Sequence, residues 1–111
     1  MGKTTTNSTT KAILQWLNYN GFRAYSVYNG AVYSAKRESY LRNPNKLKGI
    51  PDICGYRFSD GKALFVEIKT GKDRVSPEQL IFHTDAKKAE CIVLVCKSTD
   101  DFMEQIKPYI K

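Results

Sequence analysis

Apolar residues near the start of the sequence recur at helical spacing and predict a first helix. The apolar positions on one face of this helix are Ala12, Ile13, Trp16 and Leu17. Thr9 or Thr10 is suited to cap the helix, which we expect to end near Asn20. The polar, threonine-rich residues 1–8 are expected to fray.

The next part of the chain has the pattern of strands and turns. Residues 22–28 alternate loosely and are rich in aromatic and β-branched side chains, which predicts a strand. Asn29 and Gly30 mark a turn, and residues 31–35 form either a short return strand or a continuation. Residues 36–48 are the least apolar internal stretch and are interrupted by Pro44, which predicts a loop.

Two short apolar runs, separated by a turn signal at Ser59-Asp60-Gly61, predict a β-hairpin. The midpoint between Asp52 and Glu67 falls inside this turn signal, so the two acids are expected to lie opposite each other. Opposed side chains in a hairpin are about 5 Å apart at Cβ, which lets two carboxylates share one hard cation. Glu67 and Lys69 are two residues apart and point to one face, while Ile68 points to the other.

Two carboxylates and an amine suit metal-assisted hydrolysis of a phosphodiester bond. Burying two like charges together is costly unless a cation neutralises them, and Mg²⁺ is usually held by one or two carboxylates plus substrate phosphate. A nearby lysine can position or deprotonate the attacking water and can offset charge in the transition state. The alternative interpretation is an edge hairpin whose charged side chains are simply solvated.

The second half of the sequence predicts a helix, a buried strand and a final helix. Residues 76–89 begin as a capped helix, in which Ser76 is the N-cap and Gln79 completes a capping box. Gln79 has a second interpretation, in which its amide faces the metal or a phosphate. The continuous apolar run 91–96 predicts a strand buried on both faces, and Ser98 or Thr99 then caps the last helix.

Composition limits the possible classes of protein. The 111 residues are expected to form a single domain, 41% of them are hydrophobic, and no apolar run approaches membrane-spanning length, so we expect a soluble cytoplasmic protein. Three cysteines within apolar runs favour reduced thiols, and a zinc site is disfavoured because His83 is the only histidine. The net charge of +7 favours a polyanionic partner such as nucleic acid.

Basic residues gather in two predicted loops beside the hairpin, residues 36–48 and 70–74. These loops are candidates for phosphate contacts, and Tyr33 and Tyr40 are available to stack on bases. The candidate nucleic-acid-binding residues are Lys36, Arg37, Arg42, Lys46, Lys48, Lys72 and Arg74. The alternative is an ordinary solvated run of charges.

The hairpin and the helix start together resemble a known nuclease family. The matching segments are Gly49-Ile50-Pro51-Asp52, Phe65-Val66-Glu67-Ile68-Lys69 and Val75-Ser76-Pro77-Glu78-Gln79. Their order and spacing resemble the VRR-NUC family of the PD-(D/E)xK nuclease superfamily. The resemblance implies an α/β fold with a restriction-endonuclease-like core, ordered α-β-β-β-α-β, whose central mixed sheet is flanked by helices and followed by a C-terminal helix.

The same resemblance implies an activity and roles for individual residues. It implies Mg²⁺- or Mn²⁺-dependent cleavage of DNA, with Asp52, Glu67 and the Ile68 carbonyl as metal ligands. Lys69 would orient or activate water, and Gln79 would support the site from its helix. Stand-alone members, many from phages, resemble Holliday-junction resolvases and act as homodimers, so branched DNA is a candidate substrate.

One departure from the family keeps two further hypotheses open. Many members carry a metal-binding glutamate on the first helix, but residues 4–17 contain no acidic residue. Asn7, Gln15 or a threonine could take its place, or two carboxylates could suffice. The chain could instead be a weakly active or inactive nucleic-acid-binding protein on a nuclease scaffold. A third hypothesis is a structural or partner-binding phage protein whose positive charge is incidental.

Overall fold

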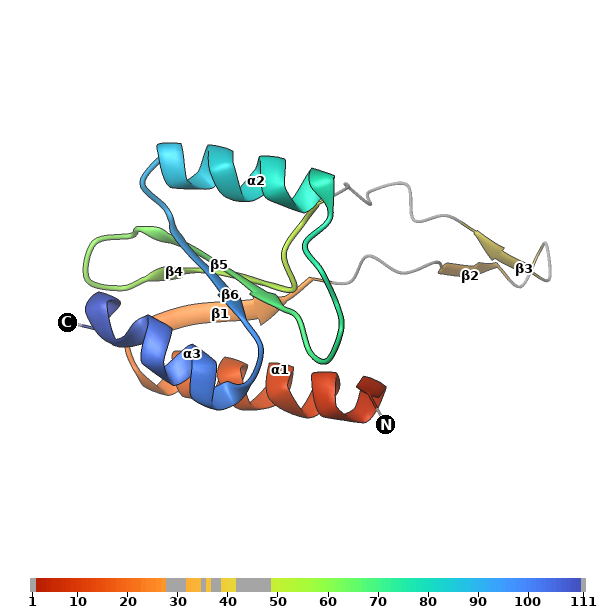
Figure 1. The fold of residues 1–111 in the computed structure, drawn as a ribbon, viewed down its shortest axis with the longest axis horizontal. Coiled ribbons are helices and arrows are strands. Elements are labelled where there is room, and N and C mark those ends of the chain that lie inside the picture. The colour runs from red at the N-terminus through yellow and green to blue at the C-terminus, as the bar shows by residue number, and fades with distance from the viewer. Residues whose placement is uncertain (1, 28–31, 35, 37–38, 42–48, 111) are drawn as a thin grey trace.

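A four-stranded mixed sheet lies between two layers of helices in the computed structural model of the chain, which describes residues 2–27, 32–34, 36, 39–41 and 49–110 (Figure 1). The elements are α1 (Gly2–Tyr19), β1 (Phe22–Ser26), β2 (Val32–Ser34), β3 (Ser39–Leu41), β4 (Ile53–Arg57), β5 (Ala63–Ile68), α2 (Pro77–Lys88), β6 (Ile92–Cys96), α3 (Thr99–Ile106) and the 3₁₀ helix η1 (Lys107–Tyr109). The predicted α/β fold, with a mixed sheet flanked by helices and a helix at the C-terminal end, is confirmed.

The strand order in the main sheet is β1-β4-β5-β6. β4 is antiparallel to both neighbours, and β5 is parallel to β6. In the β4–β5 hairpin, Ile53 lies opposite Val66 and Tyr56 opposite Ala63, which is the predicted register. Extending this ladder by one position places Asp52 opposite Glu67.

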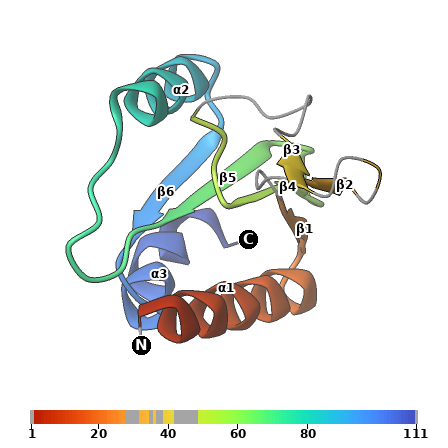
Figure 2. The same cartoon turned by 90° about the vertical axis from the view of Figure 1, so that its right-hand side faces the viewer.

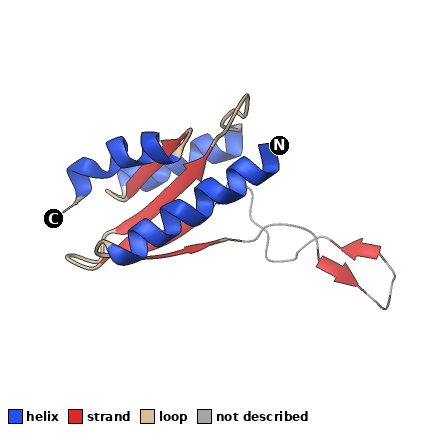
Figure 3. Cartoon of the chain, turned by 90° about the horizontal axis from the view of Figure 1, so that it is seen from below, coloured by secondary structure: helices blue, strands red, loops and turns tan. Residues whose placement is uncertain are grey.

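Helices cover the two faces of the sheet unequally. α1 and α3 lie together on one face, where they bury the main apolar core, and α2 lies on the other face (Figure 2). Seen from below, α1 lies over the sheet and runs roughly along its strands (Figure 3). The main core consists of Ile13, Leu17, Phe22, Ala24, Ile53, Leu64, Val66, Ile68, Ile92, Leu94, Cys96, Phe102 and Ile106. On the opposite face, Phe65 of β5 meets Phe82 of α2 edge to face, with ring centroids 5.0 Å apart.

Two sequence-based boundaries are wrong. α1 begins at Gly2 rather than at Thr9 or Thr10, because no proline or glycine interrupts the helix after its first residue. β2 pairs with β3, so it is neither a return strand to β1 nor its continuation. β3 also occupies part of the loop expected at 36–48, of which residues 37–38 and 42–48 lie outside the described structure.

Several local predictions are confirmed. Ser76 caps α2 with a full capping box, and Ser98 caps α3. Trp16 belongs to the packed interior rather than a free surface, because its ring meets Phe102 edge to face at 5.6 Å. Among the described residues, no helix has both the length and the apolar character needed to cross a membrane.

Candidate active site

Three segments meet where β4 begins and β5 ends. Asp52 immediately precedes β4, Glu67 is the penultimate residue of β5, and Gln79 lies in the first turn of α2. Gly49 allows the chain before Asp52 to approach α2 closely. A Cβ atom there would lie 2.5 Å from the backbone oxygen of Glu78, and its φ of +85° also favours glycine. The Gly-x-Pro-Asp sequence therefore packs the first acid against the helix that carries Gln79.

Asp52 is held at the start of β4 by hydrogen bonds from both neighbouring segments. Its backbone oxygen accepts a hydrogen bond from the Val27 N–H at 3.0 Å. Its side-chain Oδ2 accepts one from the Ile68 N–H at 2.8 Å, which fixes the carboxylate against the end of β5. Because the N–H and C=O of a paired strand residue point to the same neighbour, the Ile68 carbonyl is directed toward the same side as Asp52.

Glu67 is a buried carboxylate with only half of its polar surface satisfied. Its Oε2 accepts a hydrogen bond from Gln79 Nε2 at 2.9 Å and lies 3.3 Å from Lys69 Nζ. Its Oε1 is buried and has no hydrogen-bond partner among the described residues. Burial, followed by the negative charge of Asp52, raises the pKa of Glu67 to about 7, although Lys69 opposes the shift.

Gln79 completes the predicted capping box, and its side chain also contacts Glu67. Its Oε1 accepts from the Ser76 N–H at 2.8 Å, and its own N–H donates to Ser76 Oγ at 3.1 Å, which closes the capping box. The remaining amide nitrogen is thereby oriented toward Glu67. The local chemistry that starts α2 thus also positions a donor at the acidic pair.

These residues form a set of oxygen donors that fits a hard divalent cation. Asp52 and Glu67 supply two adjacent carboxylates, and the unpartnered Glu67 Oε1 is the atom that a cation would satisfy. Within the described residues, no group of three or more histidine, cysteine, aspartate and glutamate side chains is arranged to hold a metal ion. Water and substrate phosphate would therefore complete the coordination of an ion held by two acids.

The predicted nucleic-acid-binding residues are placed only in part. Lys36, Lys72 and Arg74 are exposed. Lys72 and Arg74 lie on the loop between β5 and α2, which extends along one side of the molecule (Figure 2). The remaining four, Arg37, Arg42, Lys46 and Lys48, lie outside the described residues, as do the side chains of Tyr33 and Tyr40.

Two groups near the site were not assigned any role from the sequence. Cys54 is half-buried on the same face as Asp52, and burial, Asp52 and Glu67 raise the pKa of its thiol. His83 of α2 is buried, and burial together with the charges of Lys87 and Lys69 lowers its pKa. The spacing of Cys54, two residues after Asp52, could have revealed the first. The proximity of His83 to Lys69 depends on the docking of α2, which local spacing does not define.

A comparison with protein families identifies one matching domain. The model described as the VRR-NUC domain matches residues 5–100, from α1 to the start of α3. The sequence matches no curated protein. The family match covers the Asp52 segment, the Glu67 segment and the start of α2.

Proposed function

The chain belongs to the VRR-NUC family, whose domain implies nuclease-type chemistry, and on that premise we propose that it is a DNA endonuclease dependent on Mg²⁺ or Mn²⁺. The observation that carries the proposal is the buried, unpartnered Oε1 of Glu67 beside Asp52. A structural carboxylate with this burial would be expected to have partners for both oxygens. This one is held through Oε2 alone and keeps Oε1 for a ligand.

The ion would be held by Asp52, Glu67 and the Ile68 carbonyl. When bound, the ion would polarise the scissile phosphate and lower the pKa of a bound water. Gln79 holds Glu67 through Oε2, so the carboxylate keeps one orientation and Oε1 would be available to the ion. Asp52 is fixed in the same way by the Ile68 N–H.

Lys69 supplies the positive charge beside the reacting phosphate. Its Nζ lies 3.3 Å from Glu67 Oε2, which keeps the ammonium at the acidic pair. Hydrolysis forms a bond from water oxygen to phosphorus and breaks the bond to a sugar oxygen, while a proton is transferred from the water to the leaving oxygen. Lys69 would orient the water and stabilise the negative charge that develops on the phosphoryl oxygens.

The proposed substrate is DNA, and a branched junction is the substrate form to test first. A junction has two symmetric strands to cut, and a two-fold homodimer would present two matched sites to them. The basic residues of the predicted loops, together with the net charge of +7, support binding of the phosphate backbone. The family resemblance to junction resolvases is the reason for choosing this form.

A plasmid-nicking assay with Mn²⁺, Mg²⁺ or EDTA tests the proposal. Wild type should nick only with a divalent ion, and Asp52→Asn and Lys69→Met should lower the rate by about 100- to 1000-fold, the usual cost of removing one electrostatic stabiliser. Gln79→Ala and Ser76→Ala form a matched pair, because each removes one of the two hydrogen bonds of the capping box but only Gln79→Ala releases Glu67. Only Gln79→Ala should slow nicking, and a four-way junction beside a linear duplex tests branch selectivity.

A second candidate function is DNA binding without cleavage. It is favoured by the absence of acidic residues in α1 and of a third metal-binding side chain at the acidic pair, within the described part of the chain. Binding without nicking by any of the proteins, in any metal, would support this candidate and refute the endonuclease.

A further inference from the structure

α2 covers only part of the sheet face on which it packs. α2 packs over β6 and β5, where Phe82 covers Phe65. On the same face, no described helix covers β1 and β4. Three aromatic side chains are exposed there: Tyr25 by 60%, Tyr56 by 44% and Phe58 by 56%. Figure 1 shows α2 on one side of the sheet, with α1 and α3 on the other.

Strand register places these rings with an arginine in one continuous row. Tyr25 lies opposite Cys54, and Arg23 lies opposite Tyr56, so all four residues point to the same face. Phe58 follows at the end of β4, where its ring meets Tyr56 edge to face at 5.8 Å. The Arg23 guanidinium carbon lies 5.5 Å from the Phe58 ring centroid. We call Arg23, Tyr25, Tyr56 and Phe58 the aromatic strip.

The aromatic strip leads directly away from the acidic pair. Asp52 and Cys54 are two residues apart on one strand, and Tyr25 is the cross-strand neighbour of Cys54. The row therefore runs from the site to Phe58 over six residues, or about 20 Å at the usual rise of a strand. That length accommodates several nucleotides.

The chemistry of the strip matches an unpaired nucleic-acid strand. Exposed apolar residues are usually scattered singly, whereas here three rings and an arginine are contiguous. Proteins that bind single strands combine stacked aromatic rings with positive charge, and a duplex offers no free base faces. Asp60, at the turn beyond the strip, is paired with Arg57 and therefore adds little repulsion. The exposed aliphatic residues Leu80 and Ile81 lie instead on α2, and such a pair is better suited to a protein contact.

We propose that the aromatic strip binds a single-stranded DNA segment, stacking its bases on Tyr25, Tyr56 and Phe58 beside Arg23 and leading the strand to or from the acidic pair. The placement beside a cleavage site rests on the proposed nuclease function, but the binding itself does not. The substrate class implied is DNA with an unpaired segment next to the cut, such as a flap or a frayed junction arm.

Fluorescence anisotropy in EDTA tests the strip without any cleavage. The probes are a labelled single strand of about 12 nucleotides, within the range of known single-strand sites, the same strand made abasic, and a matched duplex. Tyr25→Ala and Tyr56→Ala should each weaken single-strand binding by about 5- to 100-fold, the range that one lost base–ring stack allows. Tyr56→Phe should retain binding. Tyr19→Ala, an exposed tyrosine on α1, is the control and should have no effect.

The outcomes separate the inference from its alternatives. Wild type should bind the abasic strand weakly, and the alanine variants should match it there, because no base remains to stack. Equal single-strand affinity in wild type and both alanine variants would overturn the proposal. A monomer–dimer equilibrium that shifts in the variants, with DNA binding unchanged, would assign the strip to contact between copies. Strip-dependent binding by a wild-type protein that shows no metal-dependent nicking would leave the inference standing without the catalytic role.

Discussion

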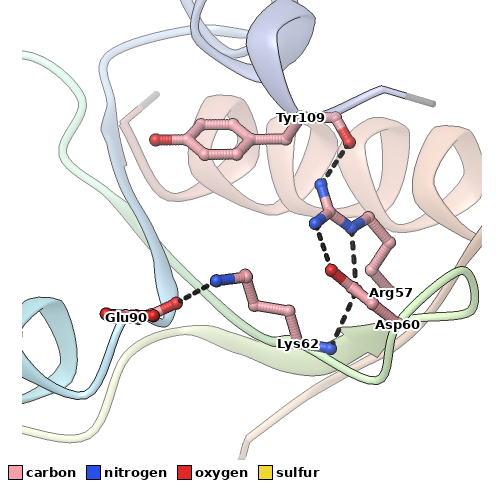
Figure 4. Close-up of polar contacts among 5 residues, drawn as sticks. All are labelled: Arg57, Asp60, Lys62, Glu90 and Tyr109. Atoms are coloured by element: carbon pink, nitrogen blue, oxygen red, sulfur yellow. Dashed lines mark hydrogen bonds and ion pairs between the residues drawn. The ribbon is translucent and has the colours of Figure 1, made fainter.

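The two ends of the β4–β5 hairpin both bury a charge, but they treat it in opposite ways. At the turn end, Arg57 donates from Nε to the Asp60 carboxylate at 3.0 Å and from Nη1 to the backbone oxygen of Tyr109 at 2.8 Å (Figure 4). In the same region, Lys62 Nζ donates to the backbone oxygen of Glu90 at 2.9 Å. At the open end, Glu67 is only 3% exposed, and its Oε1 has no partner among the described residues.

The electrostatic consequences have opposite signs. The Arg57 guanidinium, followed by the Lys62 backbone N–H, holds the pKa of Asp60 well below its usual range. Burial and Asp52 raise the pKa of Glu67 to about 7. A charge with partners joins parts of the fold, here the hairpin turn and η1, whereas a charge denied them is a candidate for ligand binding. The comparison predicts that the turn end of the hairpin contributes to stability, whereas the open end carries the proposed function.

The largest expected effect is a loss of stability at the open end as the pH rises. Glu67 has an ordinary pKa of 4.5, raised to about 7 on folding, so the folded protein binds this proton more tightly than the unfolded chain. The free energy of unfolding should therefore fall between about pH 4.5 and pH 7, by about 3 kcal/mol for a shift of this size. Urea denaturation in EDTA at several pH values measures it.

Glu67→Gln is the matched control, because it retains the shape of the side chain but cannot titrate. Its free energy of unfolding should lack this fall and should instead rise slightly with pH, because burial lowers the pKa of His83 on folding. Excess Mn²⁺ should restore wild-type stability at pH 7 by binding only the folded state. Asp60 cannot imitate the effect, since its contribution is lost only as the pH falls below the ordinary value of 3.8. A wild-type curve parallel to that of Glu67→Gln would show that Glu67 is not destabilising.

The sequence predicted the hairpin because its information is local. The turn at Ser59 to Gly61 and the period of two along the strands together define one register, which brings Asp52 opposite Glu67. The α2 start was equally predictable, since Ser76 and Gln79 lie close enough in sequence to bond each other. Both features require only neighbours within a few residues or one turn.

The features that escaped prediction depend on where α2 docks. From the sequence, Gln79 could be a cap or a site residue. Only the packing of α2 beside Glu67 shows that its side chain bonds to both Ser76 and Glu67. Tyr25 and Tyr56 have the pattern of strand residues, and no local signal tells that α2 leaves their part of the sheet open. The early start of α1 escaped for another reason, because threonine is only a moderately poor helix former.

The next effect in size tests whether the turn end is purely structural. Arg57→Met retains an apolar stem but loses the contacts to Asp60 and Tyr109, so we expect a loss of about 2 kcal/mol in the free energy of unfolding. Nicking, measured well below the unfolding temperature, should not change. Lys107→Ala is the control, because its exposed pair with Glu104 should contribute almost nothing. Slower nicking by folded Arg57→Met would show that the turn end of the hairpin also affects the reaction, and its role would then not be purely structural.

The smallest expected effect concerns backbone strain at the turn end. Glu90 has a φ of +65° just after α2, where glycine is preferred, and its backbone oxygen binds Lys62. Backbone strain often marks function, but here it lies beside the satisfied charges rather than the acidic pair.

Glu90→Gly should raise the free energy of unfolding by about 0.5 kcal/mol, because relief of about 1 kcal/mol of strain exceeds the cost of the added freedom of the unfolded chain. The melting temperature should rise by about 2 °C, Glu90→Ala should show no such gain, and nicking by Glu90→Gly should equal that of wild type. A stabilised Glu90→Gly protein with slower nicking would mean that the strain serves the reaction from the far end of the hairpin.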